Sequence, residues 1–406
     1  MGDYDFGSGC TNPETFPVQE LAEAAARAIA DVGTAFSRYP GDMGHMGLRE
    51  VMAARESERE GVTVSPDHIA LTNGSMQGVT LVAEAFMGGG AGSGGEDIVV
   101  TEELTYSGTI GAYRRLGMRL VGVPLDEQGM RIDALEATLA DLHGKGTPPR
   151  FIYTLATYQN PTGSVMPKTR RLELIEVARR YDCLVVEDHC YADVHFEGEK
   201  EPSLYALDDS PSQIFLCSLS KILGPGVRQG YLMARPPILE RIMGRRFDGG
   251  NSLLTAAALA EFFRGNVWDH CERMNASLKE KRDAVFAGLE NSVGDICTWS
   301  RPAGGLFVWV GLPDDVDRQK LAALANERGL RFAPGSAFHI HGEDVPFLRL
   351  AFGYIGLDDI HRGLPVLGEC IREARTRVAE NADKNTEGQA SALAVEPSAV
   401  AAAAGS

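Results

Sequence analysis

Apolar residues along the chain follow two alternating patterns, short continuous runs and longer stretches with helical spacing. The continuous runs are bounded by turn residues and are typical of buried strands; they cover residues 69–71, 97–103, 119–126, 151–155, 183–188, 214–217 and 230–233. Helical spacing covers residues 18–31, 107–116, 131–144 and 168–181, with further helices opening near Leu48 and Met76. This alternation predicts a mostly parallel sheet with helices on both faces.

The pattern changes beyond residue 235. Residues 253–289 are mostly helical, and residues 296–313 then read as strands joined at Gly304-Gly305. The segment KLAALANERGL predicts a helix, and FLRLAFGYI predicts a strand that carries Arg349. We therefore expect four parts: an arm and part of a small domain (1–38), a large domain (39–255), a small α+β domain (256–375) and a disordered tail (376–406).

Length and charge limit the possible functions. A chain of 406 residues can bury a large core, and it has no apolar run of membrane-spanning length. Its N-terminus lacks the regions of a signal peptide, and its seven cysteines show no paired spacing, so we expect a cytoplasmic protein without a metal site. A formal net charge of −17 argues against nucleic-acid and membrane partners.

Lys221 lies just past the apolar run that ends at Cys217, in the segment FLCSLSKILGPGVRQGYL. A lysine amine that is removed from water loses its proton more readily and can form a Schiff base. Small hydroxyl residues and an arginine nearby suit a phosphate dianion. A surface lysine in a strand-to-loop turn explains this segment equally simply, so the chemical interpretation depends on the rest of the chain.

Other polar residues follow the predicted strands in the same way. Since the loops after parallel strands gather at one edge of a sheet, a single ligand could contact Ser75, Tyr106, Asn160, Asp188, Tyr191, Lys221 and Arg228. Pyridoxal 5′-phosphate matches this set. Lys221 would bind its aldehyde, and Asp188 would pair with its protonated ring nitrogen. Asn160 and Tyr191 would bind its ring hydroxyl, and Tyr106 would stack on its ring.

Several motifs occur together in a fixed order over about residues 5–370: NPETFP, TNGSMQG, TYQNPTG, VVEDHCYADVHFEG, SLSKILGPGVRQGYL, PAGGLFVW and FLRLAF. With these motifs the chain resembles the fold-type I pyridoxal-phosphate enzymes of the class I/II aminotransferase family, in the branch of 2-aminoadipate aminotransferases and MocR-type domains. The resemblance implies an aspartate-aminotransferase-like fold, in which a mostly parallel seven-stranded sheet flanked by helices is joined to a smaller α+β domain.

The resemblance also implies roles for single residues. Lys221, Asp188 and Tyr106 would be catalytic, and Arg349 would clamp the substrate's α-carboxylate beside Asn160 and Gly9. The implied cofactor site consists of Ser75, Met76, Gln77, Tyr106, Asn160, Asp188, Tyr191, Ser218, Ser220, Lys221 and Arg228, with Tyr39 reaching the phosphate of a neighbouring subunit. Such a protein would be a homodimer with shared active sites, acting on an amino acid and a 2-oxo acid.

Two other functions remain open at this point. The same cofactor supports elimination or replacement at the β or γ carbon, and the loops GDMGHMG (41–47) and FDGGNSLL (247–254), both expected to face the substrate, depart from the aminoadipate-type pattern. MocR-type regulators use this domain as a ligand sensor and carry a DNA-binding domain N-terminal to it. We expect an enzyme, because the aminotransferase pattern begins almost at residue 1 and the chain is acidic.

Overall fold

The computed structural model describes residues 2–88 and 96–376, and its largest element is a seven-stranded sheet. The strands are β2 (Ile69–Thr72), β3 (Ile98–Glu102), β4 (Arg119–Val123), β7 (Phe151–Thr154), β8 (Leu184–Asp188), β9 (Gln213–Ser218) and β10 (Gly230–Met233). Their order is β2-β10-β9-β8-β7-β3-β4, and β10 runs antiparallel to both of its neighbours. The prediction of a mostly parallel seven-stranded sheet is confirmed.

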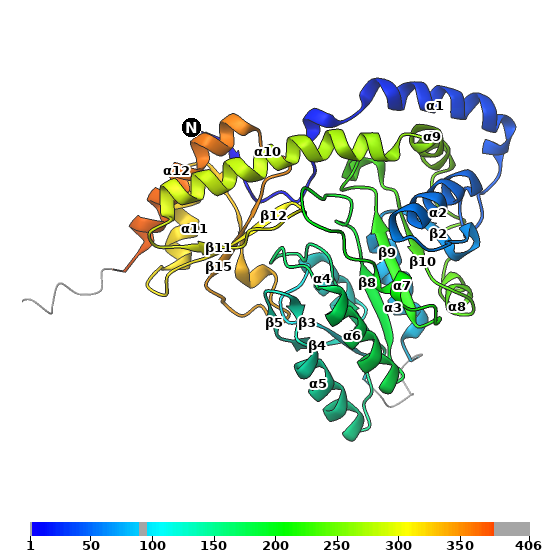
Figure 1. Cartoon of the computed structure of the whole chain (residues 1–406), viewed down its shortest axis with the longest axis horizontal. Coiled ribbons are helices and arrows are strands. Elements are labelled where there is room, and N and C mark those ends of the chain that lie inside the picture. The colour runs from blue at the N-terminus through cyan, green and yellow to red at the C-terminus, as the bar shows by residue number, and fades with distance from the viewer. Residues whose placement is uncertain (1, 89–95, 377–406) are drawn as a thin grey trace, which may run out of the picture.

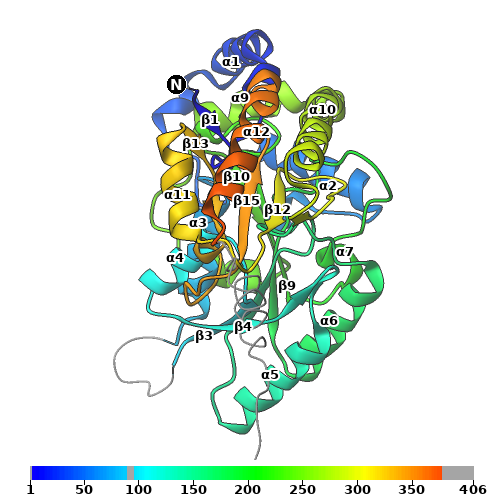
Figure 2. The same ribbon diagram turned by 90° about the vertical axis from the view of Figure 1, so that its left-hand side faces the viewer.

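Both faces of this sheet are covered, because successive side chains of a strand point to opposite sides. In β3, Val99 packs with α3 (Ser75–Phe86) and α4 (Ser107–Arg115), whereas Ile98 and Val100 pack with α5 (Ile132–Gly144) and α6 (Lys168–Arg180). The two helix pairs lie on opposite sides of the sheet (Figure 2). Two short helices complete this part, α7 (Leu204–Leu207) and α8 (Ile238–Met243).

A second, smaller sheet has its own hydrophobic core. It is antiparallel, in the order β11 (Thr298–Trp299), β12 (Phe307–Gly311), β15 (Phe347–Ala351) and β14 (Ala333–Pro334). The helices α11 (Arg318–Glu327) and α12 (Leu357–Ala374) pack on it, and β1 (Tyr4–Asp5) pairs with β13 (Leu330–Arg331) beside it. A hairpin of β5 (Leu125–Asp126) and β6 (Gly129–Met130) forms a separate pair.

The helix α10 (Val267–Val293) runs from the large sheet to the small one (Figure 1). Its first half packs into the larger core and its second half into the smaller core. The helices α1 (Val18–Val32), α2 (Met46–Glu60) and α9 (Leu253–Phe263) group beside the β2 edge of the large sheet. The domain limits at residues 38, 255 and 375 stay a prediction, and the predicted tail after Thr376 lies outside the described residues.

Candidate active site

The carboxyl ends of β8 and β9 and the first turn of α3 surround a cavity of about 140 Å³. Nine of the predicted site residues line this cavity: Ser75, Met76, Tyr106, Asp188, Tyr191, Ser218, Ser220, Lys221 and Arg228. They meet because loops that follow parallel strands emerge at one edge of the sheet. Residues separated by more than 150 positions in the sequence therefore face one small volume.

Asp188 is the last residue of β8, and its side chain is buried. The Tyr153 hydroxyl donates to Asp188 Oδ2 at 2.8 Å, whereas Oδ1 is buried and has no hydrogen-bond partner among the described residues. Burial raises the pKa of Asp188, while the nearby Cys190 thiol, Tyr153 hydroxyl and Lys221 ammonium oppose the rise. A partnerless carboxylate oxygen in a cavity wall is a ready acceptor for a ligand N–H group.

Lys221 is partly buried, and the surface that it retains faces the cavity. Its Nζ donates to the Gly9 carbonyl at 2.9 Å and lies 5.4 Å from the centre of the Tyr191 ring. Removal from water lowers the pKa of Lys221; the Arg349 guanidinium adds to this effect and the Asp188 carboxylate opposes it. The amine is thus neutral, and nucleophilic, in a larger fraction of molecules than an ordinary lysine amine.

The start of α3 is suited to bind an anion. Ser75 is the first residue of this helix, where backbone N–H groups and the helix dipole favour a phosphate. A Cβ added to Gly74 would lie 2.6 Å from the Arg228 guanidinium, and one added to Gly230 would lie 2.9 Å from the Ser75 nitrogen. Both glycines let the backbone approach closely enough to form this cradle, which Arg228 borders with its positive charge.

Arg349 extends from β15 of the small sheet toward the large one, and its side chain is buried. It donates to Asn160 Oδ1 at 3.0 Å and to the Gly7 carbonyl at 2.9 Å, and the guanidinium lies 4.1 Å from the centre of the Phe307 ring. Asn160 in turn donates to the Tyr191 hydroxyl at 3.4 Å. Burial lowers the pKa of Arg349 to about 10, so the side chain remains charged at neutral pH.

Five predicted residues are not part of the cavity lining of this chain: Gly9, Tyr39, Gln77, Asn160 and Arg349. Gly9 and Asn160 contact the lining residues Lys221 and Tyr191, and Arg349 contacts Asn160, whereas Gln77 and Tyr39 lie elsewhere. Gln77 accepts the Asn73 amide and donates to Asp248 Oδ2 at 2.5 Å, so its side chain braces the loop rather than contacting the cavity. Tyr39 is 87% exposed and lies against Gly249. The loops 41–47 and 247–254 pack on each other, and neither is part of the lining of the cavity.

The sequence pattern did not identify three residues that lie at or against the cavity, Tyr153, Leu155 and Pro225. Tyr153 pairs with Val186 across β7 and β8, which places Asp188 two residues further on the same face. An aligned pair of adjacent parallel strands would therefore have identified Tyr153 from sequence. Leu155 and Pro225 carry no such signal, because apolar and turn residues occur throughout the chain.

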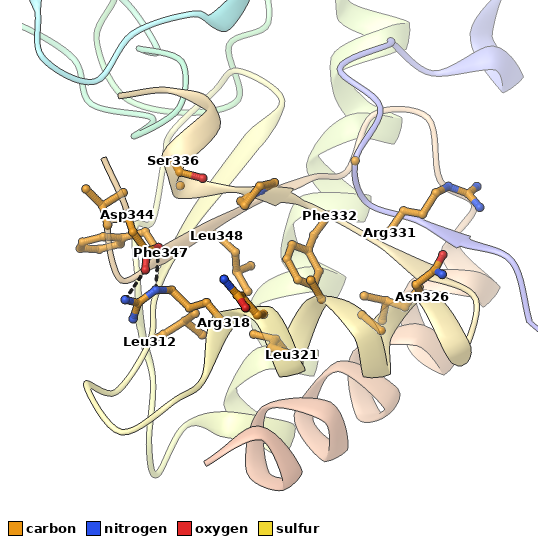
Figure 3. Close-up of a pocket in the computed structure, with 18 of the residues that line it drawn as sticks. Leu312, Arg318, Leu321, Asn326, Arg331, Phe332, Ser336, Asp344, Phe347 and Leu348 are labelled. Carbon is orange, nitrogen blue, oxygen red and sulfur yellow. Dashed lines mark hydrogen bonds and ion pairs between the residues drawn. The ribbon is translucent and has the colours of Figure 1, made fainter. Parts of the chain in front are cut away.

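A wider groove of about 760 Å³ lies on the small-sheet part of the molecule (Figure 3). Apolar side chains line it, among them Leu321 of α11, Leu348 of β15, and Phe332 between β13 and β14. The charges at one end are already matched, since Arg318 pairs with Asp344. Lys221, Asp188 and the cradle at α3 are absent from its lining, so the chemistry belongs to the smaller cavity.

The smaller cavity fits pyridoxal 5′-phosphate in each of its parts. Lys221 provides the amine, Asp188 Oδ1 provides a free acceptor for the ring nitrogen, and the Ser75 cradle with Arg228 suits the phosphate. Fold and site together define a pyridoxal-phosphate-dependent enzyme of the aspartate-aminotransferase-like fold. The chain belongs to the family of class I and II aminotransferases, whose model matches residues 2–355.

Relatives with known names support this assignment. The chain is 32% identical to aromatic-amino-acid aminotransferase 1 of Thermococcus litoralis, over 90% of this chain and 87% of the relative. It is 32% identical to 2-aminoadipate transaminase of Thermus thermophilus, over 91% and 90%. The solved structure of α-aminoadipate aminotransferase from Thermus thermophilus, complexed with N-(5′-phosphopyridoxyl)-L-leucine, has a TM-score of 0.83 at 31% identity and covers 92% of this chain and 93% of that one. An HTH-type transcriptional regulator of Bacillus subtilis is 29% identical, over 90% of this chain and 73% of the regulator.

The protein is therefore a pyridoxal-phosphate-dependent aminotransferase, an enzyme that transfers an amino group between an amino acid and a 2-oxo acid. The expected activity and cofactor are confirmed, and the expectation of a lyase or replacement enzyme is not supported. In the part of the chain that the structure describes, every helix is too short or too polar to cross a membrane. The same residues contain no cluster of three side chains able to hold a metal ion.

Proposed function

We propose that Lys221, Asp188 and Arg349 carry the transamination, and that the cofactor phosphate is held by Ser75, Ser218, Ser220 and Arg228. One observation carries this assignment: the partnerless Oδ1 of Asp188 and the amine of Lys221 line the same small cavity. An unpaired buried carboxylate oxygen destabilises a protein unless a ligand completes its hydrogen bonding.

Pyridoxal phosphate supplies an aldehyde that captures the amino group and a ring that withdraws electrons, which makes the Cα proton acidic. The Lys221 amine accepts this proton at Nζ, a task that its lowered pKa favours because the amine is then more often neutral. Asp188 Oδ1 would accept a hydrogen bond from the ring nitrogen, and the negative charge of Asp188 would keep that nitrogen protonated. Tyr106 and Tyr191 shield these groups from water along the cavity wall.

Arg349 binds the α-carboxylate of the amino acid. Its guanidinium offers paired donors in a fixed plane, which matches the geometry of a carboxylate. Asn160 holds the guanidinium in place with a hydrogen bond, and the Phe307 ring holds it through a cation–π contact. The Gly7 carbonyl bonds to the same side chain, so the N-terminal arm borders the substrate position.

Reduction with borohydride tests the assignment of Lys221. Treatment of the holoenzyme followed by peptide mass spectrometry is expected to find the phosphopyridoxyl group on Lys221, and Lys221→Ala is expected to trap none. Lys200→Ala is the matched control, because burial also lowers the pKa of Lys200 although it lies outside the cavity, near the Trp268 ring. If Lys221→Ala still traps cofactor covalently, another lysine is the anchor and the assignment is wrong.

We also propose a homodimer in which Tyr39 contacts the cofactor phosphate of the partner subunit. Tyr39 and Phe247 are 87% and 90% exposed, and large aromatic side chains with this exposure are typical of surfaces that a partner covers. Both residues lie in segments that pack beside the Gln77–Asp248 contact, next to the phosphate cradle.

Hybrid dimers test this sharing of the active site. Tyr39→Ala and Lys221→Ala are each expected to be nearly inactive as homodimers. In a hybrid, one site would combine an intact Lys221 with an intact Tyr39 from the other subunit, so mixing after mild denaturation is expected to restore up to half of the activity per hybrid. If the mixture stays inactive although hybrids form, Tyr39 acts within its own subunit or not at all.

We further propose that the enzyme works in the cytoplasm without a nucleic-acid partner. All seven cysteines are unpaired, which is the usual state in a reducing compartment. The net charge of −17 repels phosphodiester backbones. Retarded migration of a mixed-sequence DNA duplex at low salt would contradict the second point, and recovery of the protein outside the cytoplasmic fraction would contradict the first.

A further inference from the structure

Tyr153 lies within β7 and is fully buried. Its partner across the strands is Val186, so Asp188, two residues further along β8, projects from the same face. The Tyr153 hydroxyl donates to Asp188 Oδ2 at 2.8 Å. The strand register therefore places a hydroxyl donor against one of the two carboxylate oxygens and leaves the other oxygen open.

Thr109 extends this arrangement by one more hydroxyl. Its Oγ1 lies 3.0 Å from the Tyr153 oxygen. Because the single hydroxyl hydrogen of Tyr153 points to Asp188, Thr109 is the donor of this second bond. The Thr109 amide also donates to the carbonyl of Tyr106, which lines the cavity. The first turn of α4 thus connects the cavity wall with the hydroxyl pair behind Asp188.

We propose that Tyr153, supported by Thr109, is a positioning residue for Asp188: it occupies Oδ2, leaves Oδ1 to the ring nitrogen, and keeps the proton on that nitrogen. The inference rests on the proposed role of Asp188 and deepens it. A hydrogen bond to the ionised form of a carboxyl group stabilises that form. Tyr153 therefore counteracts the burial of Asp188 and lets a carboxylate, rather than a neutral acid, face the ring.

Tyr153 is a dependable donor for this purpose. Burial, together with the charge of Asp188, raises the pKa of Tyr153 well above the usual tyrosine range, so its hydroxyl keeps the hydrogen at any working pH. Without this bond the buried Asp188 would more readily take up the proton itself. The ring nitrogen would then be neutral, and the ring would withdraw electrons from the substrate less strongly.

The test uses the holoenzyme loaded with cofactor that carries ¹⁵N at the ring nitrogen, whose chemical shift reports its protonation. Tyr153→Phe removes only the hydroxyl. Tyr113→Phe is the matched control, since the Tyr113 ring packs edge-on against Tyr153 at 5.8 Å and its buried hydroxyl has no hydrogen-bond partner among the described residues. Thr109→Val removes the outer hydroxyl and serves as a milder variant of the same arrangement.

In Tyr153→Phe we expect the ¹⁵N shift to move toward the neutral-pyridine range. The value of kcat should fall by about tenfold to a hundredfold, the size of one hydrogen bond to a charged group, while KM stays near wild type because Arg349 is untouched. Thr109→Val should change both in the same direction by less, and Tyr113→Phe should change neither.

An unchanged ¹⁵N shift in Tyr153→Phe, or an equal change in Tyr113→Phe, would overturn the positioning role. Asp188→Ala separates this failure from that of the proposed function. If Asp188→Ala loses the pyridinium signal while Tyr153→Phe keeps it, only the role of Tyr153 is wrong. If Asp188→Ala keeps the signal, the role of Asp188 itself is wrong, and the inference about Tyr153 falls with it.

Discussion

Glu102 provides a quantitative test of the electrostatics of this fold. It is the last residue of β3 and is fully buried, and its Oε1 accepts the Thr154 hydroxyl at 2.6 Å and the Leu155 amide at 3.0 Å. In the part of the chain that the structure describes, no lysine or arginine forms an ion pair with it. Burial without a cation outweighs the hydrogen bonds and raises the pKa of Glu102 to about 7.

The sign and size of the effect on stability follow from this shift. The folded protein holds a proton on Glu102 up to about pH 7, whereas the unfolded chain releases it near 4.5. The folded state therefore binds more protons in this window, and its stability falls as the pH rises from about 4.5 to about 7. At about 1.4 kcal/mol per pH unit, the interval from 4.5 to about 7 corresponds to about 3.5 kcal/mol.

Glu102→Gln removes the ionisable group and keeps an oxygen acceptor for Thr154 and Leu155. We expect its unfolding free energy, relative to wild type, to increase by about 2.5 kcal/mol between pH 5 and pH 8, because part of the effect has already developed below pH 5. Urea unfolding of both proteins at pH 5, 6, 7 and 8 measures this difference, in which the other titrating groups cancel. Glu103→Gln, a change at the neighbouring and less buried position, is the control. Parallel pH profiles for wild type and Glu102→Gln would refute the reasoning.

Three further substitutions test single contacts. Arg349→Lys loses the planar pair of donors and should raise KM for the amino acid about tenfold or more in steady-state assays, with cofactor affinity unchanged. Gly230→Ala places a Cβ 2.7 Å from the Cys217 carbonyl oxygen and 2.9 Å from the Ser75 nitrogen, so spectroscopic titration should show weakened cofactor binding. Lys281→Met removes the buried ammonium 2.9 Å from Asn12 Oδ1 and should lower the unfolding free energy by about 1–3 kcal/mol in urea denaturation.

Each of these expectations has a clear contrary result. Arg349→Lys with an unchanged KM would remove Arg349 from the carboxylate site. Gly230→Ala with wild-type cofactor affinity would mean that the backbone cradle tolerates a methyl group. Lys281→Met with wild-type stability would mean that the contact between α10 and the N-terminal arm contributes little.

Much of the large sheet was predictable, because its strands are buried on both faces and appear as continuous apolar runs. The apolar pattern does not give the direction of β10. The eleven residues between Ser218 and Gly230 do favour an antiparallel return, because they are too few for a crossover helix. The helix α12 was missed. Its apolar face at Ile360, Leu364, Leu367 and Ile371 has helical spacing, but Pro365 and two glycines within it argue for a loop.

The site was predictable to the extent that strand ends meet at one edge of a sheet. This rule alone predicts that Lys221 and Asp188 face the same cavity. The place of Gln77 depended on packing between distant segments, since its amide is taken by Asp248, 171 residues away. The contact of Arg349 with Gly7 likewise joins residues 342 positions apart, and local patterns carry no information on such pairs.

The helix α10 ties the two halves of the molecule into one cooperative unit. Met274 and Leu278 belong to the larger core, and Val285 and Leu289, two to four turns further along the same rod, belong to the smaller one. Neither core can unfold without disturbing α10, whose other half is still packed in the remaining core. Protected amide hydrogens in the two halves of α10 should consequently show the same free energy of opening in hydrogen exchange. Heating should produce one transition rather than two.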